Sequence, residues 1–138
     1  MAKLIMCQGL PGSGKTYWAL EMMRQNPGTV IRVNKDDIRA ILKVNHGWVW
    51  SQAAELQDVI PKRDDQIVAG LKAGMTVISD DTNLQRPHKE RLAQLAFENG
   101  AEFEVKRFET PLEECILRDS RRSDHATCTV LCQYHLTP

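Results

Sequence analysis

The stretch GLPGSGKTYW, residues 9–18, lies between the apolar run KLIMCQ and the helix-like segment ALEMMRQ. It contains the pattern G-x-x-x-x-G-K-T, whose fixed positions are Gly9, Gly14, Lys15 and Thr16. Glycines allow backbone N–H groups to turn around phosphate oxygens, and the N-terminus of the following helix adds a partial positive charge. We expect Lys15 to reach the β- and γ-phosphates and the Thr16 hydroxyl to ligate Mg²⁺. The stretch predicts a loop that binds ATP or GTP.

The alternative to this interpretation is chance, because so short a pattern also occurs in unrelated chains. Here, however, the pattern lies between a strand-like and a helix-like segment, which is the context that a phosphate loop requires. The expected nucleotide contacts come from the whole loop and are Gly9, Pro11, Gly12, Ser13, Gly14, Lys15 and Thr16.

The rest of the chain alternates between strand-like and helix-like segments. Apolar and β-branched runs predict strands over 2–8, 29–34, 75–81 and 101–109. Helical spacing predicts helices over 15–25, 35–44, 52–74, 85–100 and 110–122, and Pro61 should kink or divide the third. This order predicts one α/β domain over residues 1–138, with a mainly parallel sheet of four to five strands and helices on both faces. In such sheets ligands bind beyond the carboxyl ends of the strands.

The second predicted strand is followed by NKDDIR, residues 34–39. Acidic residues favour the N-terminus of any helix through capping and the helix dipole, which would account for Asp36 and Asp37. It would not account for Arg39, three residues after Asp36 and on nearly the same helix face. The functional interpretation is that one carboxylate accepts a proton from an attacking hydroxyl while Arg39 binds a phosphate of the same acceptor.

The third predicted strand is followed by SDDTN, residues 79–83. An aspartate at the end of an apolar strand, opposite a phosphate loop, is suited to hold Mg²⁺, often through water. The alternative is a simple turn, because Asp, Thr and Asn all favour turns. The phosphate loop makes the metal interpretation the preferred one. Neighbouring residues of a strand point to opposite faces, so Asp80 and Asp81 are both candidates.

The last predicted helix leads into RDSRRSDH, residues 118–125, where Arg118, Arg121 and Arg122 lie close together. In an NTP-binding fold, such a cluster suits a lid that neutralises charge on the transferring phosphoryl group. A solvated helix end explains the cluster equally well, because cations favour helix C-termini.

Taken in this order, these segments resemble the phage-type polynucleotide 5′-kinases over nearly the whole chain. GLPGSGKTYWA and NPG are similar to the family's first loop, helix and turn, and NKDDIR matches its N-[RK]-D-D-x-R acceptor motif. ISDDTNL matches its D-[TN]-x-N-type strand end, and RDSRR is similar to its basic lid. The acceptor motif is the specific element, since very many NTPases share the phosphate loop. The resemblance implies a P-loop kinase fold with a C-terminal basic lid.

The resemblance also implies an activity, the transfer of the γ-phosphate of ATP to a 5′-hydroxyl end of DNA or RNA. By position in the motifs, Asp36 corresponds to the general base, Arg39 to the contact with the acceptor phosphate, and Arg122 to the arginine that closes on the donor phosphates. The implied mechanism is in-line transfer, with Lys15, Mg²⁺ and Arg122 stabilising charge on the γ-phosphoryl group. ATP and Mg²⁺ are the expected cofactors, and the candidate metal-binding residues are Thr16, Asp80 and Asp81.

The sequence departs from the family in two respects. Phage members are often fused to a phosphatase domain with an aspartate-rich motif, and no such motif is present, so we expect a kinase without end-trimming activity. After the predicted lid only ATCTVLCQYHLTP, residues 126–138, remains, where the family usually continues with a helix and a strand that help to hold the nucleobase. A homo-oligomer or a partner subunit is therefore a candidate replacement for this short region.

Composition limits the other classes of function. Lys plus Arg and Asp plus Glu number 18 each and the pI is about 6.9, whereas a protein that coats nucleic acid non-specifically is normally basic. A local site for phosphates needs no net charge. No apolar run approaches the roughly 20 residues of a membrane helix, and the N-terminus lacks a signal-peptide cleavage site. We therefore expect a cytoplasmic protein that does not associate with membranes.

Two smaller clusters have both a structural and a functional interpretation. Cys128, Cys132 and His135 are spaced i, i+4, i+7, but this spacing matches no common zinc finger, so a helix with half-buried thiols is favoured over a zinc site. Four unevenly spaced cysteines also predict no disulfide framework. Trp48 and Trp50 would either stack on a nucleobase near the 5′ end or pack in the core, and core packing is the favoured interpretation.

Two other classes of function are alternatives. One is a small-molecule kinase of similar architecture, such as the zeta-toxin-like kinases that phosphorylate a nucleotide sugar. Asp36 together with Arg39 indicates an acceptor with its own phosphate, which favours the polynucleotide. The other is a non-catalytic NTP-binding switch, in which the carboxylate after the second strand has no obvious use.

Overall fold

The computed structural model describes residues 2–120. Its four strands are β1 (Lys3–Gln8), β2 (Val30–Val33), β3 (Thr76–Ser79) and β4 (Glu102–Arg107). Its helices are α1 (Lys15–Gln25), α2 (Lys35–His46), α3 (Gln52–Ala54), the π-helix η1 (Glu55–Val59), α4 (Ile60–Lys72), α5 (Arg86–Glu98) and α6 (Leu112–Ser120).

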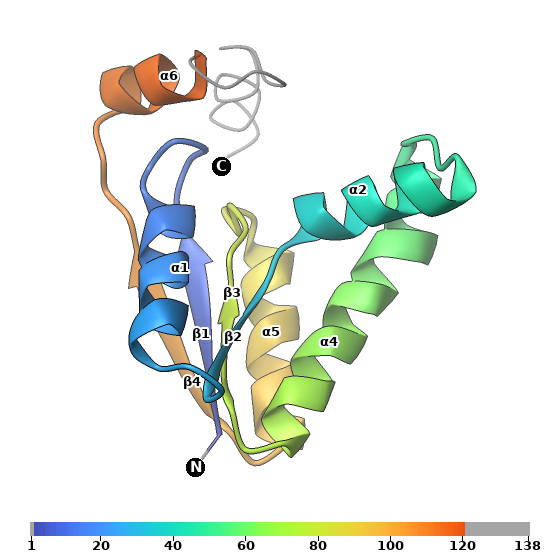
Figure 1. The fold of residues 1–138 in the computed structure, drawn as a ribbon, viewed down its shortest axis with the longest axis vertical. Helices are drawn as coiled ribbons and strands as arrows, with labels where there is room; N and C mark the ends of the chain where they lie inside the picture. Colours follow the sequence, from blue (N-terminus) through green and yellow to red (C-terminus); the bar gives the residue numbers. More distant parts are fainter. Residues whose placement is uncertain (1, 121–138) are drawn as a thin grey trace.

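The strands form one sheet in the order β2-β3-β1-β4, and all three pairs of neighbours are parallel. The α/β class and the parallel sheet with helices on both faces are therefore confirmed for the described residues. Figure 1 shows α1 on one side of the sheet and α4 with α5 on the other. Because β1 and β3 are neighbours, the phosphate loop after β1 and the SDDTN segment after β3 emerge at the same edge of the sheet.

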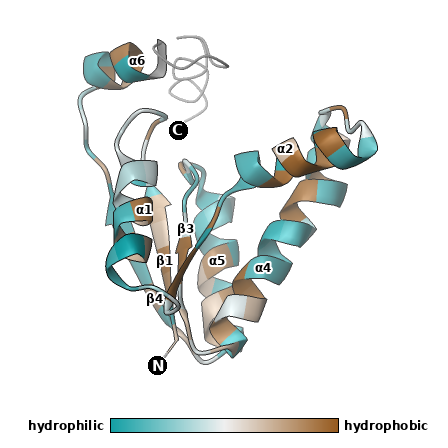
Figure 2. Cartoon of the chain, in the orientation of Figure 1, coloured by the Kyte–Doolittle hydropathy of each residue, from teal (hydrophilic) through white to brown (hydrophobic). Residues whose placement is uncertain are grey.

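Two apolar clusters hold these layers together. Strand residues alternate between them, so that Ile5 faces α1 while its neighbours Leu4 and Met6 face α4 and α5. The larger cluster joins the sheet to α4 and α5 through side chains such as Ile67 and Leu92, both completely buried. The central strands β1 and β3 are largely buried, whereas the edge strand β4 is half exposed, and Figure 2 shows apolar, brown colour on β2 and β3. The buried central strands fix the layers and leave their carboxyl ends for polar residues.

The helical segment predicted over 52–74 runs without a break from Gln52 to Lys72, but it changes type, because α3 passes into the π-helix η1, which ends at Val59, two residues before Pro61. The missing N–H of Pro61 removes one bond from the helical ladder, and the π-turns directly before it are the local distortion of this segment. The helix predicted to end at residue 44 continues to His46 and is closed by Gly47, whose φ of 62° is left-handed. These differences leave the layers as predicted.

Gly70 lets α4 approach the sheet closely, which gives a test of this packing. A Cβ at this position would lie 2.5 Å from Ile31 Cδ1 and 2.6 Å from Val77 Cγ2. We expect Gly70→Ala to lower the free energy of unfolding by about 1–3 kcal/mol, measured by urea denaturation, because overpacking outweighs the better helix propensity of alanine. Adding Ile31→Val removes one of the two clashing methyl groups and should recover part of the loss. A stabilised single variant would contradict the close packing.

Candidate functional site

The phosphate loop folds around the ammonium group of Lys15. Lys15 Nζ donates to Leu10 O at 2.8 Å and to Ser13 Oγ at 3.4 Å, and the side chain is almost fully buried. Gly12 and Gly14 have φ values of 83° and 103°, which only glycine adopts without strain. The left-handed Gly14 leads directly into α1, whose first-turn N–H groups therefore face the loop. The loop has the shape that a phosphate-binding site requires.

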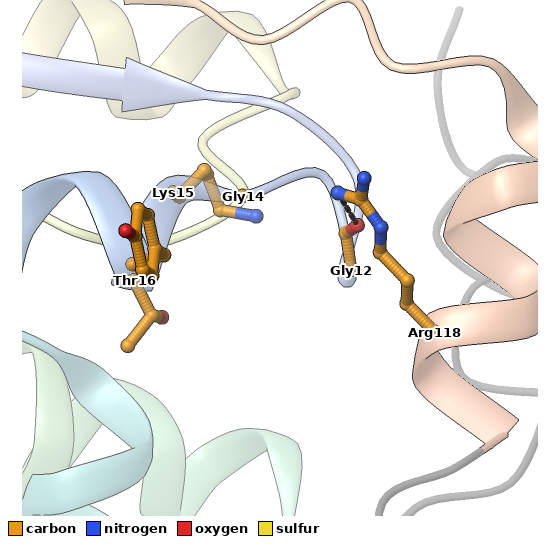
Figure 3. Close-up of a pocket in the computed structure, with 6 residues that line it drawn as sticks. Gly12, Gly14, Lys15, Thr16 and Arg118 are labelled. Atoms are coloured by element: carbon orange, nitrogen blue, oxygen red, sulfur yellow. Dashed lines mark hydrogen bonds between the residues drawn. The ribbon is translucent and has the colours of Figure 1, made fainter.

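A pocket of about 410 Å³ opens beside this loop. Its lining residues are Gly12, Gly14, Lys15, Thr16, Tyr17 and Arg118. Figure 3 shows Arg118 reaching from α6 to the loop, where its Nη1 donates to Gly12 O at 3.2 Å. The pocket thus presents two cations and a helix N-terminus, which suits the polyphosphate of a nucleotide.

The helix α6 is docked on the phosphate loop, so the start of the predicted lid contacts the loop directly. Thr110 Oγ1, just before α6, donates to Ser13 O at 2.8 Å, and Arg118 Nε donates to Glu114 Oε1 at 3.0 Å. A Cβ on Gly12 would lie only 2.6 Å from Cys115 O, so the contact depends on glycine there. Arg122 was predicted as the lid arginine and lies outside the described residues, as do Arg121 and the cluster Cys128, Cys132 and His135.

The structure separates the two candidate metal carboxylates. Thr16 Oγ1 donates to Asp80 Oδ2 at 2.9 Å, so Asp80 faces the phosphate loop. Asp81 points the other way, and its Oδ1 accepts the backbone N–H of Lys35 at 3.0 Å. This is the alternation expected of consecutive residues leaving a strand. Thr16 and Asp80 are therefore together on the nucleotide side, and Asp81 is on the side of α2.

Thr16 and Asp80 fit a magnesium ion. Asp80 is 1% exposed, and among residues 2–120 its Oδ1 is one of three buried side-chain oxygens without a hydrogen-bond partner, the others belonging to Asp81 and Asn83. Mg²⁺ takes oxygen ligands, usually one or two from protein and the rest from substrate phosphates and water. Consistent with so sparse a protein contribution, residues 2–120 contain no group of three or more His, Cys, Asp or Glu side chains arranged for a metal.

The acceptor motif opens α2. Asn34 is the N-cap residue, and its side chain accepts the N–H of Asp37 at 2.9 Å. The N-cap is thus Asn34, while Asp36 and Asp37 lie in the first turn, where the helix dipole favours acidic residues. Asp36 is 67% exposed, and its Oδ1 accepts from Arg39 Nη1 at 2.5 Å. The sequence motif thus brings Asp36 and Arg39 into direct contact.

Sequence reasoning missed Glu55, which holds Arg39 from η1. Arg39 Nε and Nη2 donate to its two carboxylate oxygens at 2.8 Å and 2.6 Å. Burial acts to raise the pKa of Glu55, but the hydrogen bonds and charge of Arg39 outweigh burial, so the pKa lies below its ordinary value. No signal in the sequence pairs these residues, because their contact depends on how η1 packs against α2.

Sequence reasoning also missed Arg32, a charged residue inside the β-branched strand β2. Its Nε donates to Asp80 Oδ2 and its Nη1 to Asp37 Oδ2, both at 2.6 Å. Arg32 therefore bridges the carboxylate beside the phosphate loop and the first turn of the acceptor helix. An arginine that interrupts an apolar strand was the available signal, since such a charge needs a partner.

A cluster of charged side chains lies between α4 and α5. Arg63 is 1% exposed and donates to Asp64 Oδ1, while Asp64 Oδ2 accepts from Arg91 at 3.1 Å. The cluster ties α4 to α5. Burial, helped by the charges of Lys35 and Arg63, lowers the pKa of His88 to about 4, so this half-buried histidine is neutral at pH 7.

The two tryptophans of the loop after α2 have different environments. Trp48 packs on a small core cluster of Ile38, Leu42 and Val59, and its Nε1 donates to Asp58 at 2.9 Å. Trp50 is 58% exposed and donates a hydrogen bond to Glu55. Core packing is thus confirmed for Trp48 and wrong for Trp50.

This fold, with the phosphate loop and an aspartate on adjacent parallel strands, defines a P-loop kinase-type domain. A family model described as "AAA domain" matches residues 4–132, and the chain belongs to that family. No helix within residues 2–120 has the length and apolar character needed to cross a membrane.

Solved structures extend the comparison. The chain is 29% identical to a chain in the "Structure of Pnkp1/Rnl/Hen1 complex", with a TM-score of 0.72, covering 85% of this chain and 38% of that one. The chain is 28% identical to a chain in the "Structure of the Pnkp1/Rnl/Hen1 RNA repair complex", with a TM-score of 0.75, covering 89% of this chain and 38% of that one. The chain thus spans well under half of the length of these two relatives.

More distant structures share the fold alone. The APS kinase CysC of Mycobacterium tuberculosis, in complex with AMPPNP and APS, is 20% identical with a TM-score of 0.63, covering 87% of this chain and 69% of that one. A gluconokinase from Sinorhizobium meliloti is 17% identical with a TM-score of 0.64, covering 99% and 75%. The P-loop kinase fold is confirmed, and it implies nucleotide binding.

The pair of Arg39 and Glu55 can be tested through stability. We expect Glu55→Gln to lower the free energy of unfolding at neutral pH by about 1–3 kcal/mol, because it leaves a half-buried guanidinium without its carboxylate. The pKa of Glu55 is lowered in the folded state, so its contribution is present above the ordinary value of 4.5 and is lost as the pH falls toward the folded value. Urea denaturation of both proteins should therefore give a difference that shrinks on acidification.

A matched control exists on the surface. Glu21 accepts from Arg24 Nε and Nη2, both at 2.9 Å, in the same two-bond geometry. Because that pair is exposed, Glu21→Gln should leave stability almost unchanged. Equal losses for the two variants would contradict a special role for Glu55 in holding Arg39.

Proposed function

We propose that this chain is an ATP-dependent polynucleotide 5′-hydroxyl kinase. The observation on which the proposal rests is a continuous line of polar contacts between the donor and acceptor sides. Thr16 binds Asp80 at 2.9 Å, Asp80 binds Arg32 at 2.6 Å, and Arg32 binds Asp37, the neighbour of Asp36, at 2.6 Å. A phosphate loop and an exposed carboxylate on one short line are what direct phosphoryl transfer to a hydroxyl requires.

The acceptor side suggests how the base becomes available. Each guanidinium nitrogen of Arg39 makes one hydrogen bond, Nη1 to Asp36 and the other two to Glu55, which uses three of its five N–H donors. An acceptor phosphate binding at Nη1 displaces Asp36 Oδ1 while Glu55 keeps the guanidinium in place. Binding of the substrate and release of the base are then one event. Asp36 accepts the proton of the 5′-hydroxyl as its oxygen attacks the γ-phosphorus and the bond to the β-phosphate oxygen breaks.

The donor side supplies positive charge around the phosphates of the nucleotide. Lys15 and the N–H groups at the start of α1 bind the phosphates, Arg118 approaches from α6, and Arg122 is the proposed closing arginine. Thr16 and Asp80 would hold Mg²⁺, which neutralises the developing negative charge of the nucleotide. Asp81, which faces α2 rather than the loop, is the less suitable of the two metal candidates.

The similar solved structures help to choose between a nucleic-acid end and a small molecule as the acceptor of the phosphate. The more similar ones come from structures named as Pnkp1 in an RNA repair complex, which favours a nucleic-acid end as the substrate of this chain. APS kinase and gluconokinase share the fold at lower identity, so a small-molecule acceptor is the second candidate. The exposed Trp50, which donates to Glu55, the partner of Arg39, favours an acceptor with a base, since an indole face offers a stacking surface.

Phosphate transfer from labelled ATP, in the presence of Mg²⁺, is the direct test. We expect transfer to a 5′-hydroxyl oligonucleotide and none to its 5′-phosphorylated twin. Asp36→Asn should lower kcat about 10²–10⁴-fold by removing the base. Asp65→Asn removes the same charge from an exposed position on α4 and serves as the control. Transfer to sugars or nucleosides but not to oligonucleotides would favour the small-molecule alternative.

Trp50 gives a test of the acceptor class. An oligonucleotide with an abasic first residue keeps its hydroxyl and phosphates but has no base to stack. We expect its KM to be about tenfold higher than that of the normal oligonucleotide, the cost of one lost base–aromatic contact. In Trp50→Ala the two KM values should converge at the higher value, and Trp50→Phe should restore the difference. Equal KM values in the natural chain would exclude stacking on Trp50 without affecting the kinase proposal.

A further inference from the structure

Arg32 is the feature that the proposed reaction does not explain. Along β2, Val30 and Arg32 lie on the α1 face of the sheet, and Val30 belongs to the apolar cluster there. The guanidinium of Arg32 is mostly buried, with 15% of the side chain exposed. A charge at such a position in an apolar strand costs free energy unless it is paired. Its partners therefore indicate its purpose.

Those partners are two carboxylates of very different exposure. Asp80 is almost completely buried, whereas the side chain of Asp37 is 62% exposed at the start of α2. Both bonds are 2.6 Å long, so the guanidinium is shared between them. A buried carboxylate without a nearby cation is strongly unfavourable, while an exposed one is solvated by water. Asp80 needs Arg32 when nothing else neutralises it, and Asp37 does not.

The bond to Asp80 uses the oxygen that faces the phosphate loop. Asp80 Oδ2 accepts both from Arg32 Nε and from the Thr16 hydroxyl, the two groups that a magnesium ion at this place would disturb. A divalent cation beside Thr16 repels a guanidinium on the same carboxylate and replaces the neutralisation that it supplied. Arg32 has a second carboxylate, Asp37, toward which it can shift without leaving its strand.

We propose that Arg32 is an internal counter-cation for Asp80, neutralising this carboxylate in the absence of metal and shifting toward Asp37 when Mg²⁺ binds. Arg32 is a positioning residue, since it acts through the two aspartates. Because Asp37 lies in the first turn of α2, next to Asp36, loading of the metal then strengthens a bond to the acceptor helix. This inference rests on the proposed metal site at Thr16 and Asp80 and not on the identity of the acceptor.

The inference differs from a purely structural role in the signs that it predicts. If Arg32 competes with the metal for Asp80, its removal increases the factor by which magnesium improves nucleotide binding. Removal of Asp37 deprives the guanidinium of its alternative partner and commits it to Asp80, which makes magnesium less effective. A structural brace predicts instead that both substitutions loosen the site and weaken metal-dependent binding in the same direction.

The experiment measures ADP binding by titration calorimetry with the full chain, once in saturating MgCl₂ and once in EDTA. The quantity compared is the ratio of the two Kd values, which reports how much magnesium improves binding. We expect Arg32→Gln to raise this ratio about fivefold and Asp37→Asn to lower it by a similar factor, the size of a solvent-screened ion pair. Arg32→Lys, which keeps the charge, should remain close to the natural ratio.

Thermal unfolding of each variant with and without MgCl₂ alone gives an independent readout and verifies folding. Asp37→Asn changes an exposed side chain, so this arm holds even where Arg32→Gln is unstable. Opposite shifts in the two variants support the proposal. A normal magnesium effect that both variants lower, or that neither changes, overturns it and leaves the proposed kinase intact. No magnesium effect in the natural chain overturns the metal site, and the role of Arg32 with it.

Discussion

The carboxylate of Asp80 is the charge on which the arrangement of the site depends. It lies at the end of a central strand, almost without contact with water, and its ionised form must be compensated from inside the protein. The hydroxyl of Thr16 and the guanidinium of Arg32 supply this compensation, one from the phosphate loop and the other from the neighbouring strand. Because β3 lies between β1 and β2, a single side chain can bind groups that emerge from both sides. The strand order is thus the reason that donor and acceptor residues share one edge.

On the proposed acceptor side, an exposed carboxylate, Asp36, is held in place by the mostly buried pair of Arg39 and Glu55. The proposed base Asp36 is exposed, as contact with a substrate would require, and an exposed carboxylate alone would have no fixed orientation. Arg39 fixes it, and Glu55 fixes Arg39 with two parallel hydrogen bonds from another helix. The π-helix that presents Glu55 immediately precedes the turn in which Pro61 starts α4. Short π-helical turns inside α-helices are frequent at functional sites.

The sequence alone was sufficient for the features that depend on local chemistry. The phosphate loop, the four strands, the glycine ends and the distorted helix before Pro61 each follow from a few adjacent residues, and the structure has them in place. The choice between Asp80 and Asp81 was beyond the sequence, because it depends on the phase with which β3 leaves the sheet. Glu55 and Arg32 were missed for a related reason: their partners are distant in the chain, and only packing of η1 on α2 and of β2 on β3 brings them together. The two tryptophans have the same local signal, and their different exposure follows from the path of the loop after Gly47.

The two halves of the site each contain an arginine that is shared between two carboxylates, Arg32 between Asp80 and Asp37 and Arg39 between Asp36 and Glu55. Arg39 Nη1 is bound to Asp36 and Arg32 Nε is bound to Asp80 Oδ2, so a phosphate or a metal at these places would compete with an ion pair already present. In the two proposals, the acceptor phosphate displaces Asp36 from Arg39, and the metal shifts Arg32 from Asp80 toward Asp37. Because Arg32 and Asp80 are paired, neither of these buried charges is left alone, and a ligand that displaces one of them has to supply a matching charge. A ligand with a phosphate and a metal compensates what it displaces, whereas a neutral molecule of similar size does not. Selectivity for phosphorylated partners then follows from the ionic pairs already present in the fold, before any contact with a base or a sugar is considered.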